Sequence, residues 1–262
     1  MKFVAPLAFV AGIAVSSIAF AGSNLVTNGD FSQNTASGLP SGVNSFEFGD
    51  TYKYGQAVTG WTSTTAPGAG AGAFNVYFQP DHAFSGPTAI SPDTRYTSSE
   101  VQYLWTNGPT ADPNGGAFVA LDGDVNARGI LSQTINGLTP GAKYDLTFDW
   151  AAAQFADRSG DTTEQLQVTF GKQTLSTAVV SNPSHSAQGW FVEHFQFTAD
   201  SASQTLSFLS VGTPTGLPPV ALLDGVSLTS AAPEPATWAL MMVGIGAIGG
   251  LLRSRRRSLA AG

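Results

Sequence analysis

Two stretches at opposite ends of the sequence carry oxygen ligands of the kind that bind Ca²⁺. The first is an Asn-Gly-Asp segment that contains Asn28 and Asp30. The second is ALLDGVSL, residues 221–228, in which strand alternation places Asp224 on an apolar face. A buried carboxylate is costly unless a cation, hydrogen-bond donors or a proton compensate it, and Ca²⁺ prefers oxygen ligands. We therefore predict a structural Ca²⁺ ion held by Asn28, Asp30 and Asp224.

Two simpler explanations compete with this calcium site. In one, Asp224 caps a β-bulge at Gly225, and in the other the Asn-Gly-Asp segment is only a tight turn. A second acidic pair, Asp122 and Asp124, has a spacing that suits a cation but lacks the further acidic positions of an EF-hand loop. For this pair we favour a solvated hairpin tip whose charge Arg128 compensates.

Catalytic motifs are not evident. His82, His185 and His194 do not have the spacing of a zinc-protease motif, and no Gly-x-Ser-x-Gly segment precedes a helix. The sequence contains no Cys, which excludes thiol chemistry and disulfide bonds. A glycosidase needs two carboxylates facing across a cleft, and the acidic residues permit this without pointing to a pair. We predict that the protein is not an enzyme.

A long segment, residues 80–116, is rich in turn residues and carries aromatic side chains. Segments of this kind inside a compact domain are usually functional or disordered. Tyr96, Tyr103 and Trp105 are candidates for stacking on a sugar ring, because aromatic rings present a flat apolar face with a polar edge. The alternative is that these rings fasten the segment to the domain, and we favour it for Trp105.

Short β-strands must position these side chains, because apolar and polar residues alternate along much of the chain. Tyr144, Phe148 and Trp150 share one parity and are separated by polar residues, which is typical of a strand with one buried face. Pro140-Gly141 just before this stretch predicts a type II turn. Strands are predicted at 74–79, 116–123, 129–137, 142–151, 164–171, 189–199, 204–212 and 220–230, with weaker candidates at 23–33, 55–61 and 101–105. This pattern predicts an all-β fold, a single antiparallel β-sandwich of jelly-roll type.

The charge of the domain restricts its partners. Residues 22–232 contain six Lys and Arg against seventeen Asp and Glu, a formal charge of −11. Nucleic acids and anionic lipids are bound through Lys and Arg, so this surface disfavours both. Neutral glycans and cations are better candidates.

The two ends of the chain predict export. Residues 1–21 combine Lys2, an apolar run over 3–15 and the small-residue site at Ala21, which is typical of a helical signal peptide cut after Ala21. The apolar run is shorter than the ~20 residues of a membrane span, which disfavours an N-terminal anchor. The domain is predicted over 22–230. Beyond it, residues 236–252 form an apolar stretch near the minimum length for a transmembrane helix.

The C-terminal segment 231–257 resembles a known sorting signal. Its parts are Pro233-Glu234-Pro235, Trp238, the apolar span and a basic cluster formed by Arg253, Arg255, Arg256 and Arg257. This order resembles the PEP-CTERM tail, specifically its PEPxxWA subclass. The resemblance implies an exported protein of a Gram-negative bacterium that makes exopolysaccharide, with the export machinery and an exosortase as partners. It also implies transient anchoring in the inner membrane, with the C-terminus cytoplasmic as the positive-inside rule requires, and then release to the cell envelope, surface or exterior.

The body resembles exported galactose-binding-like β-sandwich domains. The resemblance is carried by NLVTNGDFS at 24–32, GGAFVALDGD at 115–124, LSQTINGLTPGAKYDLTF at 131–148 and GTPTGLPPVALLDGVSL at 212–228. Many such domains have an acidic residue where this chain has Ser32, which removes one possible calcium ligand. Together these features predict an exported, non-catalytic envelope or matrix protein with polysaccharide as its candidate ligand. The alternatives are a structural or adhesive matrix protein without specific sugar binding, and a polysaccharide hydrolase.

Overall fold

The structure is a computed structural model, and it describes residues 22–36, 45–49, 57–70, 72–79, 104, 116–155, 158–217, 219–231 and 241–249. Residues 23–231 form one compact unit. Its strands are β1 (Ser45–Phe48), β2 (Thr62–Thr65), β3 (Asn75–Phe78), β4 (Phe118–Asp122), β5 (Gly129–Asn136), β6 (Lys143–Gln154), β7 (Thr162–Phe170), β8 (Gln173–Ser176), β9 (Val180–Asn182), β10 (Phe191–Thr198), β11 (Ser203–Thr213) and β12 (Pro219–Ser230).

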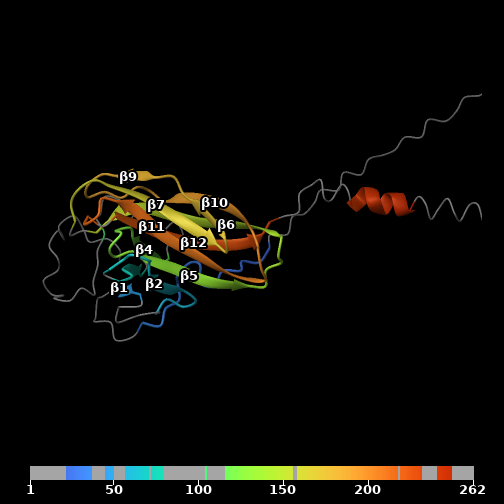
Figure 1. Cartoon of the computed structure of the whole chain (residues 1–262), viewed down its shortest axis with the longest axis horizontal. Helices are drawn as coiled ribbons and strands as arrows, with labels where there is room; N and C mark the ends of the chain where they lie inside the picture. The colour runs from blue at the N-terminus through green and yellow to red at the C-terminus, as the bar shows by residue number, and fades with distance from the viewer. Residues whose placement is uncertain are drawn as a thin grey trace, which may run out of the picture. The chain divides into compact units, whose positions relative to one another are not determined.

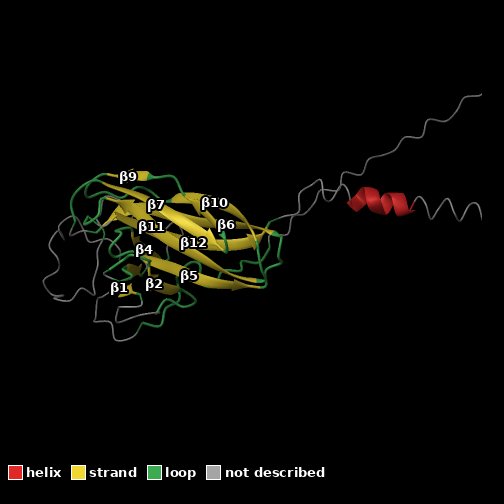
Figure 2. Ribbon diagram, viewed as in Figure 1, coloured by secondary structure: helices red, strands yellow, loops and turns green. Residues whose placement is uncertain are grey.

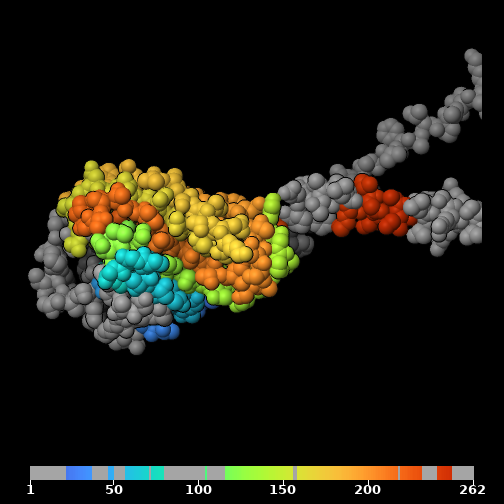
Figure 3. Space-filling model, in the orientation of Figure 1, coloured from blue at the N-terminus to red at the C-terminus, as the bar shows by residue number. Residues whose placement is uncertain are grey.

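The strands form two antiparallel sheets that pack face to face (Figures 1 and 2). The first sheet has the order β1-β3-β4-β12-β6-β10, and the second has the order β2-β5-β11-β7-β8 with β9 also paired to β7. Strands adjacent in a sheet are often distant in sequence. In Figure 3 the cyan surface of residues 57–79 therefore lies against green and orange surfaces from much later segments. The predicted all-β sandwich is confirmed.

The main core fills the space between the two sheets because alternate residues of the strands point inward. Along β7 every second residue from Thr162 to Phe170 is buried, and the intervening residues are partly exposed. Phe148 of the first sheet meets Phe208 of the second edge to face, with ring centroids 5.3 Å apart. Aromatic pairs of this geometry stabilise a core beyond the area that they bury.

A second apolar cluster covers the outer face of the first sheet. It includes Phe78 of β3, Phe118 of β4 and Leu222 of β12, and Leu104 joins it through an isolated bridge to Phe155. The central part of this sheet is therefore buried on both faces, and β3 and β4 are buried at every position.

Most of the predicted strands are present, with differences at the short ones. β3 to β7 and β10 to β12 lie within or overlap the predicted ranges. The strand predictions at 23–33 and 55–61 are wrong, because the described residues of these ranges form no strand; β2 begins directly after Trp61, and β1, β8 and β9 were not predicted. The Pro140-Gly141 turn is present, with Gly141 at φ 82° and the amide of Ala142 bonded to the carbonyl of Thr139.

The N-terminal segment of the domain lies beside its last strand. The amide of Leu25 donates to the carbonyl of Leu228, and the amide of Val226 donates to the carbonyl of Gly29. A side chain at position 29 would collide with the carbonyl oxygen of Val226, so this close approach requires glycine. The two ends of the domain are therefore neighbours, as the calcium prediction assumes.

The tail is described only at residues 241–249, which are helical. Within the described part of the chain, no helix is long and apolar enough to cross a membrane. The predicted span 236–252 includes this helix, and its remaining residues, 236–240 and 250–252, lie outside the described residues. Ala21, the Pro233–Pro235 motif, Trp238 and the Arg cluster 253–257 also lie outside them.

Candidate functional site

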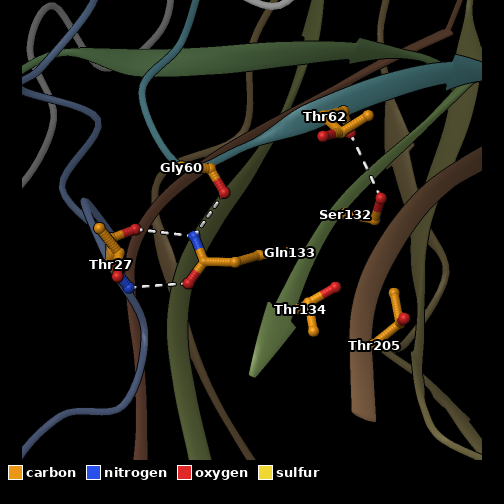
Figure 4. A pocket seen from close by; sticks show the side chains of 7 residues that line it. All are labelled: Thr27, Gly60, Thr62, Ser132, Gln133, Thr134 and Thr205. Atoms are coloured by element: carbon orange, nitrogen blue, oxygen red, sulfur yellow. Dashed lines mark hydrogen bonds between the residues drawn. The ribbon is translucent and has the colours of Figure 1, made fainter. Parts of the chain in front are cut away.

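An open groove of about 550 Å³ lies at the outer face of the second sheet. One wall comes from the N-terminal segment and the turn before β2, and the floor comes from β2, β5 and β11 (Figure 4). All the lining residues are uncharged, and most carry a hydroxyl group: Thr27, Gly60, Thr62, Ser132, Gln133, Thr134 and Thr205. The groove is within the size range of ligand sites in proteins.

Gln133 fixes the wall of this groove to its floor. Its Oε1 accepts a hydrogen bond from the amide of Thr27 at 2.7 Å, and its Nε2 donates to the carbonyls of Thr27 and Gly60 at 2.9 Å (Figure 4). The side chain is 8% exposed. One carboxamide thus satisfies three backbone groups from two segments that belong to no strand.

The floor of the groove continues as a row of hydroxyl groups across the whole second sheet. Strand register places one hydroxyl residue opposite the next on five consecutive strands: Thr62, Ser132, Ser207, Thr169 and Thr174. We call these five residues the hydroxyl row. Adjacent strands are about 4.8 Å apart, so the row is on the order of 19 Å long.

The side chains of the row are within reach of solvent and partly preorganised. Each is partly or fully exposed. The Oγ1 atoms of Thr169 and Thr174 are hydrogen-bonded at 2.9 Å, and Ser132 Oγ donates to the carbonyl of Thr62 at 3.4 Å. The row is not evident from the sequence, because the register that aligns its members is not encoded within any one strand.

Asn28 and Asp30, two of the predicted calcium ligands, make local hydrogen bonds. Asn28 Oδ1 accepts from the amide of Gln33 at 2.9 Å, and Asn28 Nδ2 donates to the carbonyls of Gln33 and Thr59. Asp30 is exposed and accepts two hydrogen bonds from Ser32. The tight turn is present, with Asn28 in the left-handed region at φ 53°. These bonds account for the Asn-Gly-Asp segment without a metal, and the calcium site stays a prediction.

Asp224, the third predicted ligand, is buried at a bulge. The register of β12 with β6 shifts between Asp224 and Ser227, and Gly225 within the shift has φ 61°. The bulge changes the parity of the strand: Leu222 belongs to the outer cluster, whereas Val226 belongs to the core between the sheets. Asp224 therefore shares a face with Leu222 only, and its direct partner across the sheet is Asp149 of β6.

Asp122 and Asp124 are buried, so the prediction of a solvated hairpin tip is wrong. They are 3% and 7% exposed, and Asp124 Oδ2 accepts a hydrogen bond from the amide of Gly216 at 2.6 Å. Burial raises the pKa of Asp122 to about 7. Burial, with repulsion from Asp122, raises the pKa of Glu164 well above its usual range.

The remaining candidates from the sequence divide between placed and unplaced residues. His185 Nε2 and Ser159 Oγ are 2.7 Å apart, which is a distance seen between a catalytic base and its nucleophile. The amide of Gly160, next to Ser159, already donates a hydrogen bond to Ser184 Oγ, so it is not available to stabilise an oxyanion. His194 lies 4.0 Å from Asp145 at the surface. Outside the described residues lie His82, Tyr96, Tyr103 and Trp105.

The fold is similar to that of several solved structures. A structure described as "CBM4 structure and function" is 13% identical with a TM-score of 0.33, and the match covers 79% of this chain and 99% of the other. A putative sugar binding protein from Bacteroides thetaiotaomicron VPI-5482 is 10% identical with a TM-score of 0.37, covering 80% and 100%. TmCBM61 in complex with beta-1,4-galactotriose is 13% identical with a TM-score of 0.30, covering 80% and 99%. At these levels the likeness concerns the fold alone. No curated protein matches the chain.

Two family profiles match the sequence. One, described as "Protein of unknown function (DUF642)", matches residues 94–227, which is just over half of the chain. The other, the PEP-CTERM protein-sorting motif, matches residues 231–257 and indicates an exported protein that is sorted through its C-terminus. The chain therefore belongs to the DUF642 family and carries a PEP-CTERM sorting motif at its C-terminal end.

Proposed function

We propose that this exported protein binds neutral polysaccharide, without catalysis, in the groove and along the hydroxyl row. The hydroxyl row is the observation that supports this proposal most strongly. A sugar chain offers hydroxyl groups at every unit, and Ser and Thr hydroxyls both donate and accept hydrogen bonds. A regular row of hydroxyls matches such a ligand better than it matches a charged or apolar one.

Charge complementarity favours neutral over acidic polysaccharides. The lining of the groove is uncharged, and the domain carries a formal charge of −11. Like charges repel at low ionic strength, so a uronic-acid polymer pays a penalty that a neutral polymer does not. Affinity electrophoresis in gels that contain neutral xylan, galactan or glucan, with alginate as the acidic comparison, tests this. We expect retardation in at least one neutral gel and none in alginate.

The sorting motif extends the proposal to location. The tail anchors the chain in the inner membrane with the C-terminus cytoplasmic, and an exosortase then cuts near Pro233–Pro235 and releases the domain to the envelope or exterior. The mass of the mature protein from native cells tests both ends at once. A mass that begins after Ala21 and ends near residue 235 supports the proposal, and a mass that includes residues 238–257 contradicts removal of the tail.

Self-association in the matrix is a second candidate function, and one edge strand favours it. β10 is an edge of the first sheet, and Val192 on it is 78% exposed. An edge strand with an exposed apolar residue can pair with another chain. Light scattering should then show concentration-dependent assembly that Val192→Lys abolishes, whereas a polysaccharide-binding monomer shows no assembly.

A further inference from the structure

Three buried oxygen atoms without hydrogen-bond partners are held by neighbouring side chains at the β7–β9 end of the sandwich. They are Oε1 of Glu164, Oγ1 of Thr162 and Oδ1 of Asn182. The three side chains are at most 3% exposed. Buried polar atoms are nearly always paired, so three neighbours without partners require an explanation. We infer that Glu164, Thr162 and Asn182 bind a Ca²⁺ ion through carboxylate, hydroxyl and amide oxygens.

Strand register brings these side chains together. Thr162 and Glu164 are two positions apart on β7, on the face that points between the sheets. Asn182 of β9 is the direct register partner of Thr162. Opposed Cβ atoms of an antiparallel pair are about 5 Å apart, so the oxygens of these residues can approach one ion. Ser210 of β11 is on the opposite side of the carboxyl, with its Oγ 3.5 Å from Glu164 Oε2.

The orientation of the Asn182 amide is determined by its other hydrogen bond. Its Nδ2 donates to the carbonyl of Ser186 at 3.0 Å, so Oδ1 faces away from that carbonyl. The Thr162 hydroxyl and the amide of Val220 lie within hydrogen-bond reach of the Glu164 carboxyl and lower its pKa, but Thr162 Oγ1 makes no well-aligned hydrogen bond. One water would satisfy the three oxygens by donating to Glu164 and Asn182 and accepting from the Thr162 hydroxyl, but only a cation also compensates the buried carboxylate.

The surrounding charges favour a divalent ion. The Asp122 carboxyl is close enough to Glu164 to raise the pKa of Glu164 by repulsion, and the positive charge of Arg158 lowers the pKa of Asp122. Among the described groups, no positive charge acts on Glu164 itself. Ca²⁺ accepts carboxylate and amide oxygens in a flexible geometry, whereas Mg²⁺ requires a near-ideal octahedron and retains several waters. A buried site built from two strands therefore suits Ca²⁺ better.

This site is separate from the one predicted at Asn28, Asp30 and Asp224. In the described ranges, no group of three or more His, Asp or Glu side chains is placed to hold a metal ion. The site inferred here is not an acidic cluster, because it combines one carboxylate with a hydroxyl and an amide. Its function would be to close one end of the sandwich, in a domain that has no disulfide bonds.

The test uses the full chain, stripped with EGTA and returned to buffer with Ca²⁺, with Mg²⁺ or with neither. Thermal unfolding and calorimetric titration with Ca²⁺ are compared for the wild type, Glu164→Gln and Thr162→Val. Asp30→Asn is the control for the other predicted site. We expect Ca²⁺ to raise the Tm of the wild type and of Asp30→Asn, and we expect this shift to be lost in Glu164→Gln and reduced in Thr162→Val.

Several results would overturn the inference. They are a wild type whose Tm does not respond to Ca²⁺, an equal response in Glu164→Gln, or a response that Asp30→Asn abolishes and Glu164→Gln retains. Glu164→Gln is nearly isosteric and removes a buried charge, so it should fold. If it does not fold, Thr162→Val decides, because Val suits a strand and removes only the hydroxyl.

Discussion

Ser132 on β5 and Ser207 on β11 are direct register partners on the outer face of the second sheet. They are the second and third members of the hydroxyl row, at the point where the groove floor passes into the open sheet. The groove and the row therefore form one continuous surface that crosses several strands. A ligand that uses this surface fully must be a chain rather than a single sugar.

The length of the row predicts how affinity depends on ligand length. With the row on the order of 19 Å long, each added sugar unit should strengthen binding until the oligosaccharide spans the row, and further units should add little. Calorimetry with an oligosaccharide series of the polysaccharide that binds would measure this. Monosaccharide binding as tight as that of the longest oligomer would contradict an extended site.

Replacing Gln133 should weaken both the fold and the groove. Gln133→Ala removes three hydrogen bonds to the backbone of Thr27 and Gly60, each worth about 1 kcal/mol net, so we expect a loss of about 2–4 kcal/mol. Polysaccharide affinity should fall as well, because the wall is no longer held to the floor. Urea denaturation measures the loss of stability. Gln165→Ala, at a partly exposed position of β7, is the matched control, and we expect it to change the free energy of unfolding by less than about 0.5 kcal/mol.

The strands that could be predicted from the sequence are those whose two faces differ. Alternation in residues 143–150 is a local signal, and it identified the first part of β6. β8 lacks that signal because three of its four residues are exposed, and it exists through pairing with β7. The hydroxyl row was not predictable for a related reason, because five strands must first be paired in one register.

Two side chains show what the local sequence pattern leaves out. Strand alternation places Asp224 on an apolar face, and the structure buries it there, but the bulge at Gly225 puts it on the face of Leu222 and not on that of Val226. Asp122 was expected in solvent because Asp-Gly-Asp is typical of a turn. In the structure, the segment before β12 packs over this turn, and Gly123 donates its amide to the carbonyl of Pro219. The bulge at Gly225 is one of the alternatives that the sequence offers for Asp224, whereas this non-local packing is not visible in the local pattern.

The buried carboxyl of Asp122 predicts an unusual pH dependence in metal-free protein. Its pKa in the folded state is about 7, against an ordinary value of 3.8, so the folded state retains a proton that the unfolded state releases. The contribution of Asp122 to the free energy of unfolding is therefore fully present below about pH 4 and is lost as the pH rises to about 7. At about 1.4 kcal/mol per pKa unit, this shift lowers the free energy of unfolding by up to ~4 kcal/mol. The raised pKa of Glu164 makes stability fall with rising pH in the same way.

Denaturation in EGTA at several pH values between 4 and 8 checks this dependence. Asp122→Asn should reduce this pH dependence, because the amide does not titrate and only the contribution of Glu164 remains, whereas Gln165→Ala changes no titratable group and should leave it unchanged. Stability that increases from pH 4 to pH 7 in the wild type would contradict the assignment.

Polysaccharide retention by the wild type and a groove variant tests the central proposal most directly. In Thr134→Val/Thr205→Val, two exposed floor hydroxyls are replaced by methyl groups of similar size that suit a strand. Thr229→Val on β12 of the first sheet is the control. Affinity electrophoresis should show retardation of the wild type and Thr229→Val in a neutral polysaccharide and loss of retardation in the double variant. The proposal would be contradicted if all three proteins were retarded equally, or if no neutral polysaccharide retarded any of them.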